Sequence, residues 1–308
     1  MKNTKYTSQN KVLKLTNDVV FKNILKDKHN KDFLVRIICL FTRLDKEYVS
    51  SHLIIADPDT LEGNAKEHHN TGDLVVDIEN NRINIEMSID NKKINKRKNE
   101  ITSYKYAFNR FKVGDNYKVG YKFFQICFEN YSVFNNNLVV NEVRLVEVSS
   151  GNFEIETDEY QKFHICLSKI PNTWYNKPEL TEMERTLLFF ITDDITKLTK
   201  ISGGDNIMEN TFDSLKSISE DSNIISEYEN NQIFKYCYNL ALAETKEEGF
   251  KQGMTKGINQ GIKQGINQGI DQEKQAIGKK MIQEGIDINT ISKITELTEE
   301  DIEKLRVA

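Results

Sequence analysis

Three carboxylates, with a fourth at Glu79 in the turn, lie within the short stretch Gly72–Ile89, which reads GDLVVDIENNRINIEMSI, and their spacing suits a metal ion. Two apolar runs flank residues 79–82, a pattern that predicts a tight β-hairpin. Opposite residues in such a hairpin have numbers that sum to roughly 159–161, so Asp73 faces Glu86, while Asp77 lies between them in sequence. Like charges that face each other are unfavourable unless a cation lies between them. We therefore expect Asp73 and Glu86 to bind Mg²⁺ or Mn²⁺, because both ions prefer oxygen ligands.

The alternative is that these acids are ordinary solvated residues at strand ends. Glu86 argues against this alternative, because it lies between Ile85 and Met87 in an apolar run. A charge within an apolar strand is seldom tolerated unless it is paired or bound to metal. The metal-site interpretation is therefore strongest at Glu86.

These residues also carry a resemblance to a known family. Asp73 and, thirteen positions later, Glu86 in INIEMS resemble the D…(D/E)-x-K core of PD-(D/E)XK nucleases. More narrowly, they resemble the recombination-promoting nuclease (Rpn)/transposase family, whose second motif usually reads NIEMQ. Other similar stretches are LTNDVVFKNIL (15–25), VGDNYK (113–118), FHICLSKI (163–170) and the tail EGIDINTISKITELTEEDIEKL (284–305). The resemblance implies a restriction-endonuclease-like PD-(D/E)XK core, DNA as substrate and a link to recombination or mobile elements.

The resemblance also implies roles for further residues. The carbonyl of Met87 would complete the metal ligands, and Asp18 and Lys22 would lie near the active centre. From spacing alone, Asp18 and Lys22 are four residues apart on one helix face, which also fits a plain surface ion pair. Ser88 stands where the family carries Gln and the superfamily Lys. Its hydroxyl can donate a hydrogen bond but supplies no charge, so either the activity is weak or Lys22 or Lys93 substitutes.

A basic run follows the hairpin. Its members within seven residues are Lys92, Lys93, Lys96, Arg97 and Lys98. The net charge of −5 is not that of a strong non-specific nucleic-acid binder, so contact with DNA phosphates would depend on this local run. A solvated helix face is the alternative explanation.

The composition limits the class of protein. With 308 residues, 38% hydrophobic and 29% charged, the chain is long enough for one or two globular domains. It contains no run of eighteen apolar residues, and MKNTKYTSQNKVLKL lacks the apolar segment of a secretory signal, so we expect a cytoplasmic protein without membrane contact. The four cysteines have apolar neighbours and no CxxC spacing, which predicts reduced core thiols.

Around the hairpin, the apolar patterns predict alternating helices and strands. We expect helices at 15–25, 32–44, 94–112 and 179–198, and strands at 121–128, 138–148 and 163–170. Together with the hairpin they predict an α/β fold, a mixed sheet flanked by helices, over residues 1–201. Residues 202–231 would form a weakly helical linker, and residues 232–308 an α-helical C-terminal extension.

The C-terminal extension carries glycine at every fourth position from Gly249 to Gly269, and isoleucine follows four of these glycines. Six interior glycines cost about 5–6 kcal/mol relative to alanine, so an isolated helix would be marginal. The repeat is either a flexible spacer or, as we prefer, a helix that self-associates through its small residues and forms a homo-oligomer.

Two short helices at 288–294 and 298–305 end the chain with helix-turn-helix spacing. Their side chains are acidic, among them Glu296, Glu299, Glu300, Asp301 and Glu303, which favours contact with protein over DNA.

Two functions fit the sequence. The first is a metal-dependent DNA endonuclease, and the second is a catalytically impaired nuclease-like protein that binds DNA or forms oligomeric assemblies. A transposase proper is disfavoured, because no separate DDE-type set of acids is present.

Overall fold

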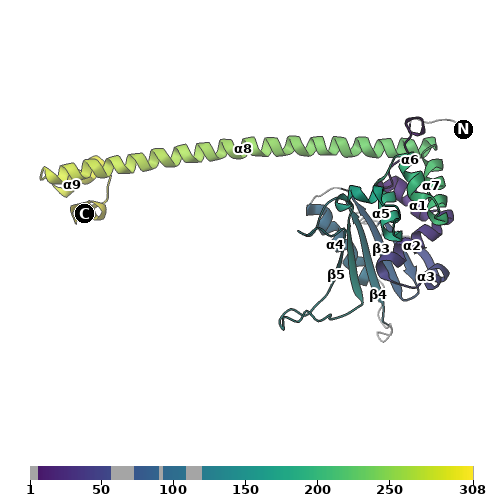
Figure 1. Ribbon diagram of the computed structural model, residues 1–308. Helices are drawn as coiled ribbons and strands as arrows, with labels where there is room; N and C mark the ends of the chain where they lie inside the picture. Colours follow the sequence, from purple (N-terminus) through teal and green to yellow (C-terminus); the bar gives the residue numbers. More distant parts are fainter. Residues whose placement is uncertain (1–5, 57–72, 90–92, 109–119, 308) are drawn as a thin grey trace. The chain divides into compact units, whose positions relative to one another are not determined.

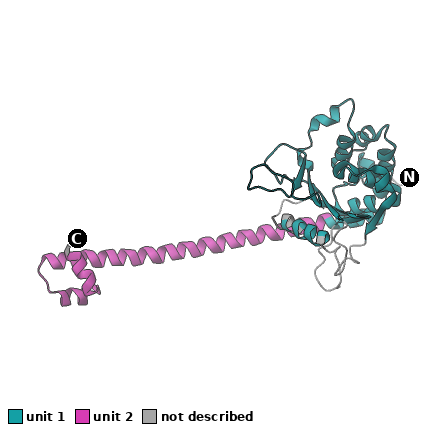
Figure 2. Cartoon of the chain, turned by 90° about the horizontal axis from the view of Figure 1, so that it is seen from below, with its two compact units in different colours: residues 1–231 teal, residues 232–308 magenta. Residues whose placement is uncertain are grey.

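The computed structural model describes residues 6–56, 73–89, 93–108 and 120–307. The chain divides into two compact units, residues 1–231 and residues 232–308 (Figure 2). The expected α/β fold is confirmed: a mixed six-stranded sheet is flanked by helices, and a helical region follows it.

The sheet of the first unit has the order β1-β2-β3-β4-β6-β5. An antiparallel meander of three strands forms one half, and the parallel strands β3, β4 and β6 continue it, with β5 antiparallel at the edge. The bounds are β1 Leu53–Ala56, β2 Leu74–Ile78, β3 Asn81–Ser88, β4 Lys122–Glu129, β5 Val140–Arg144 and β6 Tyr160–Cys166. Helix α4 (Lys93–Phe108) lies between β3 and β4 in sequence, as a parallel crossover requires.

Seven further helices of the first unit precede or follow the strands. They are α1 Asp18–Lys26, α2 Lys31–Thr42, α3 Lys46–His52, α5 Glu182–Ile191, α6 Ile195–Ser202, α7 Asn206–Ile218 and the beginning of α8 (Ser222–Gln283). Helix α1 begins directly after Asn17, whose side chain caps it by accepting a hydrogen bond from the Val19 N–H at 2.9 Å. Figure 1 shows α1, α2, α3 and α7 on one side of the sheet and α4 on the other.

The main core fills the space between α1, α2, α5 and one face of the sheet. Alternate residues of four neighbouring strands point into it, as the period of two requires: Leu74, Val76 and Ile78; Ile83 and Ile85; Phe124, Ile126 and Phe128; Phe163 and Ile165. Phe128 stacks on Phe190 of α5 with ring centroids 4.4 Å apart. We call this side the apolar face of the sheet.

The helix predicted at 179–198 is wrong in one respect, because the structure divides it into α5 and α6 at residues 192–194. The backbone there pairs with the N-terminal segment: Asp193 O accepts from Val12 N–H, and Ile195 N–H donates to Asn10 O. The Asp194 side chain then caps α6 by accepting from Lys197 N–H at 2.9 Å. This long-range pairing has no local sequence signal.

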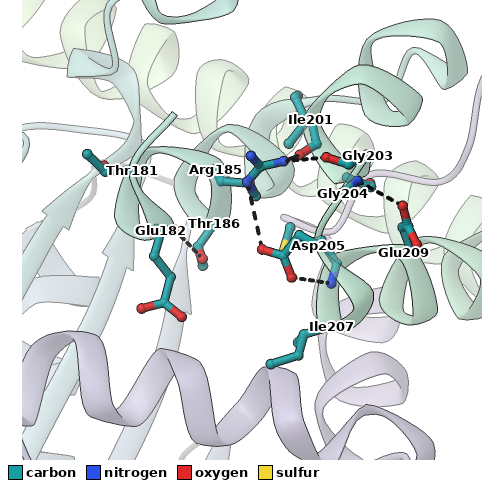
Figure 3. A network of polar contacts seen from close by, with 12 residues as sticks. Thr181, Glu182, Arg185, Thr186, Ile201, Gly203, Gly204, Asp205, Ile207 and Glu209 are labelled. Carbon is teal, nitrogen blue, oxygen red and sulfur yellow. Dashed lines mark hydrogen bonds and ion pairs between the residues drawn. The ribbon is translucent and has the colours of Figure 1, made fainter. Parts of the chain in front are cut away.

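An ion-pair network joins α2, α5 and the loop before α7, and Figure 3 shows the part of it between Arg185 and Asp205. Asp205 accepts two hydrogen bonds from Arg36 at 2.8 and 3.0 Å, and Arg36 Nε lies 2.8 Å from Glu182 Oε1. Arg185 contacts the carbonyls of Ile201 and Gly203. Burial by itself would raise the pKa of Asp205, but the hydrogen bonds from Arg36 and the attraction of nearby arginines outweigh it and hold that pKa below its ordinary value.

Residues 202–231 contribute to the core of the first unit. Met208, Phe212 and Leu215 of α7 are buried there, and Phe212 packs edge-on against Phe189. The compact unit therefore extends to residue 231, past the glycine pair at 203–204.

In the second unit, α8 continues through the whole glycine repeat without interruption, and α9 (Ile288–Thr295) and α10 (Glu299–Val307) follow it. Gly285 lies just after the end of α8 and has a positive φ of 76°. At Gly278, an added Cβ would lie 3.2 Å from Leu297 Cδ1 and 3.4 Å from Leu305 Cδ1, so α10 and the connection that precedes it approach α8 closely there. No helix within the described residues combines the length and the apolarity that crossing a bilayer requires.

Candidate functional site

The hairpin of β2 and β3 has the register that the sequence predicted. Ile78 pairs with Asn81 and Leu74 with Ile85, so the residue numbers sum to 159. A two-residue turn closes it, with Glu79 in the left-handed region at φ 47°. Continuing the ladder by one residue places Asp73 opposite Glu86.

Both oxygens of Asp73 have partners. Oδ2 accepts a hydrogen bond from the Met87 N–H at 2.8 Å, and Oδ1 lies 3.2 Å from Lys22 Nζ. The Asp73 carboxylate is therefore held at the peptide that directly follows Glu86. Lys22, on the second turn of α1, brings a positive charge from another element of the fold.

Glu86 is buried, with 5% of its surface exposed. Its Oε1 accepts a hydrogen bond from Asn84 Nδ2 at 3.0 Å, and the same amide donates to Gln125 Oε1 on β4. A buried carboxylate with polar partners agrees with the sequence argument that this charge needs compensation.

The remaining predicted residues of the site occupy different positions. Ser88 is buried at the end of β3, and its Oγ lies 3.1 Å from Tyr131 Oη. Asp18 is the first residue of α1, one turn before Lys22. Met87 points to the apolar face, and its backbone N–H holds Asp73. The structure thus brings Lys22, Asp73 and the Glu86–Met87 peptide together.

The third carboxylate of the hairpin has a different role. Asp77 accepts two hydrogen bonds from Arg82, directly opposite it on β3, at 2.8 and 2.9 Å. This bidentate pair neutralises Asp77, so the hairpin offers Asp73 and Glu86 to a ligand.

The predicted nucleic-acid contacts lie largely outside the described residues. This holds for Lys92 and for the side chains of Lys93, Lys96 and Lys98. Arg97, on the first part of α4, is exposed.

The face of the sheet opposite the main core carries polar residues that sequence reasoning did not single out as a group. We call it the polar face; besides Asn84, Glu86 and Ser88 it includes Gln125, Cys127, Glu129, Lys162 and His164. His164 Nδ1 lies 3.0 Å from Glu129 Oε2. The signal was present in KFFQICFE and YQKFHIC, where polar residues alternate with aromatic and aliphatic ones.

Comparison with known proteins gives one match. No curated protein and no solved structure matches the chain. Residues 271–307, which include α9 and α10, match a family model described as the Rpn/YhgA-like nuclease family, C-terminal HTH domain. The helix-turn-helix spacing predicted for this segment is thereby confirmed, and over these residues the match supports the resemblance to the Rpn family.

Proposed function

We propose that the chain is a metal-dependent DNA endonuclease with its active centre at the open end of the β2–β3 hairpin. The observation that carries the proposal is the position of the Asp73 carboxylate, hydrogen-bonded to the peptide after the buried Glu86 and next to Lys22. The antiparallel β1–β2–β3 meander, followed by a helix and a parallel strand, agrees with a PD-(D/E)XK core.

The donor set fits a hard divalent cation. Asp73, Glu86 and the carbonyl of Met87 would supply oxygen ligands to Mg²⁺ or Mn²⁺. Asp73 Oδ1 already faces a positive group, the ammonium of Lys22, so this position favours positive charge. When bound, the ion would activate a water molecule and neutralise charge on the scissile phosphate.

Lys22 is the residue that best replaces the missing motif lysine. Ser88 is neutral, and its hydroxyl is engaged with Tyr131. The Lys22 side chain keeps 39% of its surface exposed while its ammonium contacts Asp73. From there it can turn to a phosphate oxygen and stabilise negative charge on it.

The test is plasmid nicking by the full chain with Mg²⁺ or Mn²⁺. Asp73→Ala and Glu86→Ala should abolish nicking, and Lys22→Ala should reduce it by about 10²-fold or more. Glu79→Gln, on the exposed turn of the same hairpin, is the matched control and should cut like wild type. Absence of divalent-dependent nicking, or equal nicking by the Asp73 and Glu86 variants, overturns the proposal.

The second candidate is a nuclease-like protein that binds DNA without cutting it. Ser88 in place of the motif Gln or Lys favours it, and so does the HTH match. A DNA-binding role for residues 271–307 runs against our expectation from their acidic side chains. DNA retardation in gels without cleavage would support this candidate.

DNA contact through residues 92–98 belongs to both candidates. Replacing the five basic residues by alanine should weaken binding on all sequences and flatten its dependence on salt, because fewer counterions are released. The paired substitution Lys293→Ala and Lys304→Ala tests in the same way whether α9 and α10 contact the DNA phosphates. If the five alanine substitutions leave DNA binding unchanged, residues 92–98 make no contact with the phosphates.

We further propose that α8 self-associates into a homo-oligomer. Four of its isoleucines are about half exposed, namely Ile258, Ile262, Ile266 and Ile270. A Cβ added at the six glycines from Gly249 to Gly269 would meet nothing within 4 Å. A second copy of the helix could therefore approach this side closely and cover the isoleucines.

A further inference from the structure

Three potential metal ligands meet on the polar face of the sheet, outside the carboxylate site. A ligand atom of each of Cys127, Glu129 and His164 lies within 4.8 Å of the other two. Cys127 is paired with His164 across β4 and β6, and Glu129 is two residues farther along β4. All three side chains therefore leave the sheet on one face. All three are buried, at 0%, 2% and 8% exposure.

The chemistry of this set differs from that of Asp73 and Glu86. A thiolate, an imidazole and a carboxylate are together the ligands of Zn²⁺, whereas Mg²⁺ prefers oxygen ligands alone. The chain therefore offers ligands of two kinds at two places.

The contacts within the cluster hold the ligands in position. His164 Nδ1 lies 3.0 Å from Glu129 Oε2, within hydrogen-bond distance, so the carboxylate holds the ring in place. Gln125 Nε2 donates to Cys127 Sγ at 3.4 Å, which orients the sulfur from the next position on the same face. These contacts place the donors together before any ion arrives.

A cation that binds the cluster must displace the proton of the Cys127 thiol. Burial raises the pKa of the Cys127 thiol to about 12, so the metal-free thiol keeps its proton. A divalent cation compensates for the loss of that proton, because one thiolate and one carboxylate balance its charge.

We propose that Cys127, Glu129 and His164 bind one Zn²⁺-class cation that ties β4 to β6 on the polar face. Binding forms bonds to Sγ, to a Glu129 oxygen and to His164 Nδ1. The thiol proton goes to solvent, and the imidazole binds as the neutral tautomer that carries its hydrogen on the other ring nitrogen. Three protein ligands leave a fourth tetrahedral position for water or another oxygen.

The first experiment titrates the full metal-depleted chain with Co²⁺, a spectroscopic substitute for Zn²⁺. We expect one Co²⁺ per chain, a thiolate-to-cobalt charge-transfer band, loss of that band on adding Zn²⁺, and no effect of excess Mg²⁺. Absence of a thiolate band in wild type overturns the proposal, and the cluster is then a buried hydrogen-bonded pair beside a thiol.

The variants assign the ligands. Cys127→Ser should abolish the band, and Glu129→Gln or His164→Gln should weaken Co²⁺ binding by more than about tenfold. Cys166→Ser, a buried cysteine on β6, and Cys237→Ser, an exposed one on α8, are the matched controls and should keep the band. A band that survives Cys127→Ser, or that either control abolishes, overturns the assignment. If Cys127→Ser fails to fold, the wild-type titration and the two controls decide.

This test is independent of the proposed nuclease. Glu86→Ala should lose nicking and keep the cobalt band. If the chain shows the cobalt band but no nicking, the Zn²⁺ site stands and the nuclease proposal is rejected. If it nicks DNA but shows no band, the nuclease stands and the Zn²⁺ site is rejected.

Discussion

The polar face of the sheet and helix α8 depart from the usual hydrophobic pattern in opposite directions. The sheet buries charged groups such as Glu86 and Glu129, at 5% and 2% exposure. The helix exposes apolar ones, with Phe250 at 72% and Ile262 at 56%. In both places the residue type is unusual for its surroundings, which marks both as candidate functional surfaces.

The difference between them lies in their partners. On the sheet, buried polar side chains find partners within the chain: Asn84 contacts Glu86, Arg82 contacts Asp77 and His164 contacts Glu129. Among the described residues, two atoms of these side chains, Asn84 Oδ1 and Arg82 Nη1, are buried without a hydrogen-bond partner. The isoleucines of α8 have no comparable cover within the second unit as far as the structure describes it. The sheet thus pairs its charged groups within one chain, whereas the helix is suited to a second copy.

Removing one side chain of an ion pair on the sheet should have the largest effect on stability. Arg82→Leu removes both hydrogen bonds that Asp77 accepts from Arg82 and weakens the compensation of its partly buried carboxylate. We expect the free energy of unfolding to fall by about 2 kcal/mol, less than for a fully buried pair because Asp77 keeps some solvent contact. Urea denaturation measures it.

The double substitution Asp77→Leu with Arg82→Leu is the control, because removing both partners leaves no unpaired charge. It should recover part of the loss. A single Arg82→Leu variant as stable as wild type would show that the pair contributes nothing measurable.

The second prediction concerns pH and the Cys127 thiol in the presence of a chelator. Its pKa rises from 9.0 to about 12 on folding because of burial. The unfolded chain therefore loses this proton first, and the stability that the neutral thiol contributes below about pH 9 is lost as the pH rises toward 12. Between about pH 8 and 10, wild type should lose about 1.4 kcal/mol more than Cys127→Ala.

Burial also raises the pKa of Tyr131 to about 12, but this tyrosine is the same in both proteins and its contribution cancels in the difference. Denaturation curves at several pH values provide the measurement. Parallel pH profiles for wild type and Cys127→Ala would contradict the raised pKa.

Much of the fold followed from local sequence patterns. The hairpin register followed from the two apolar runs around residues 79–82. The break between α5 and α6 did not follow, because it depends on pairing with residues 10–12, far away in sequence. The short helix α3 was also missed, since its apolar face is hardly more than Val49.

The candidate site divides in the same way. Asp73 and Glu86 could be paired by counting from the turn, because a hairpin is a local structure. The approach of Lys22 to Asp73 and of His164 to Glu129 depends on tertiary packing and on the strand order, which one sequence does not specify. The prediction of core thiols is confirmed for Cys127 and Cys166 and is wrong for Cys237, which is exposed on α8. The polar neighbours of Cys127 come from the parallel pairing of β4 with β6.

The third prediction moves to the helix. Gly261→Ala should stabilise α8 by about 0.8–1 kcal/mol, because alanine has the higher helix propensity and its Cβ meets nothing within 4 Å. If a second copy packs on the glycines, the same change should weaken assembly. Thermal loss of helical circular dichroism at low concentration measures the first effect, and light scattering measures the second.

Asn259→Ala, off the glycine positions, is the control and should stabilise the helix without changing assembly. A Gly261→Ala chain that is more helical and equally assembled would remove the glycines from the interface.

The smallest change in stability is expected at the isoleucines. Ile262→Gln combined with Ile266→Gln should change the free energy of unfolding of the dilute chain by no more than about 0.5 kcal/mol, because both side chains are already 56% exposed. The same pair should shift assembly toward the single chain if a second copy covers these residues. Lys263→Gln, a neighbouring change outside the row, should do neither. If the double variant assembles like wild type, α8 exposes its isoleucines for a different partner. The contrast between the sheet and the helix would then hold without self-association.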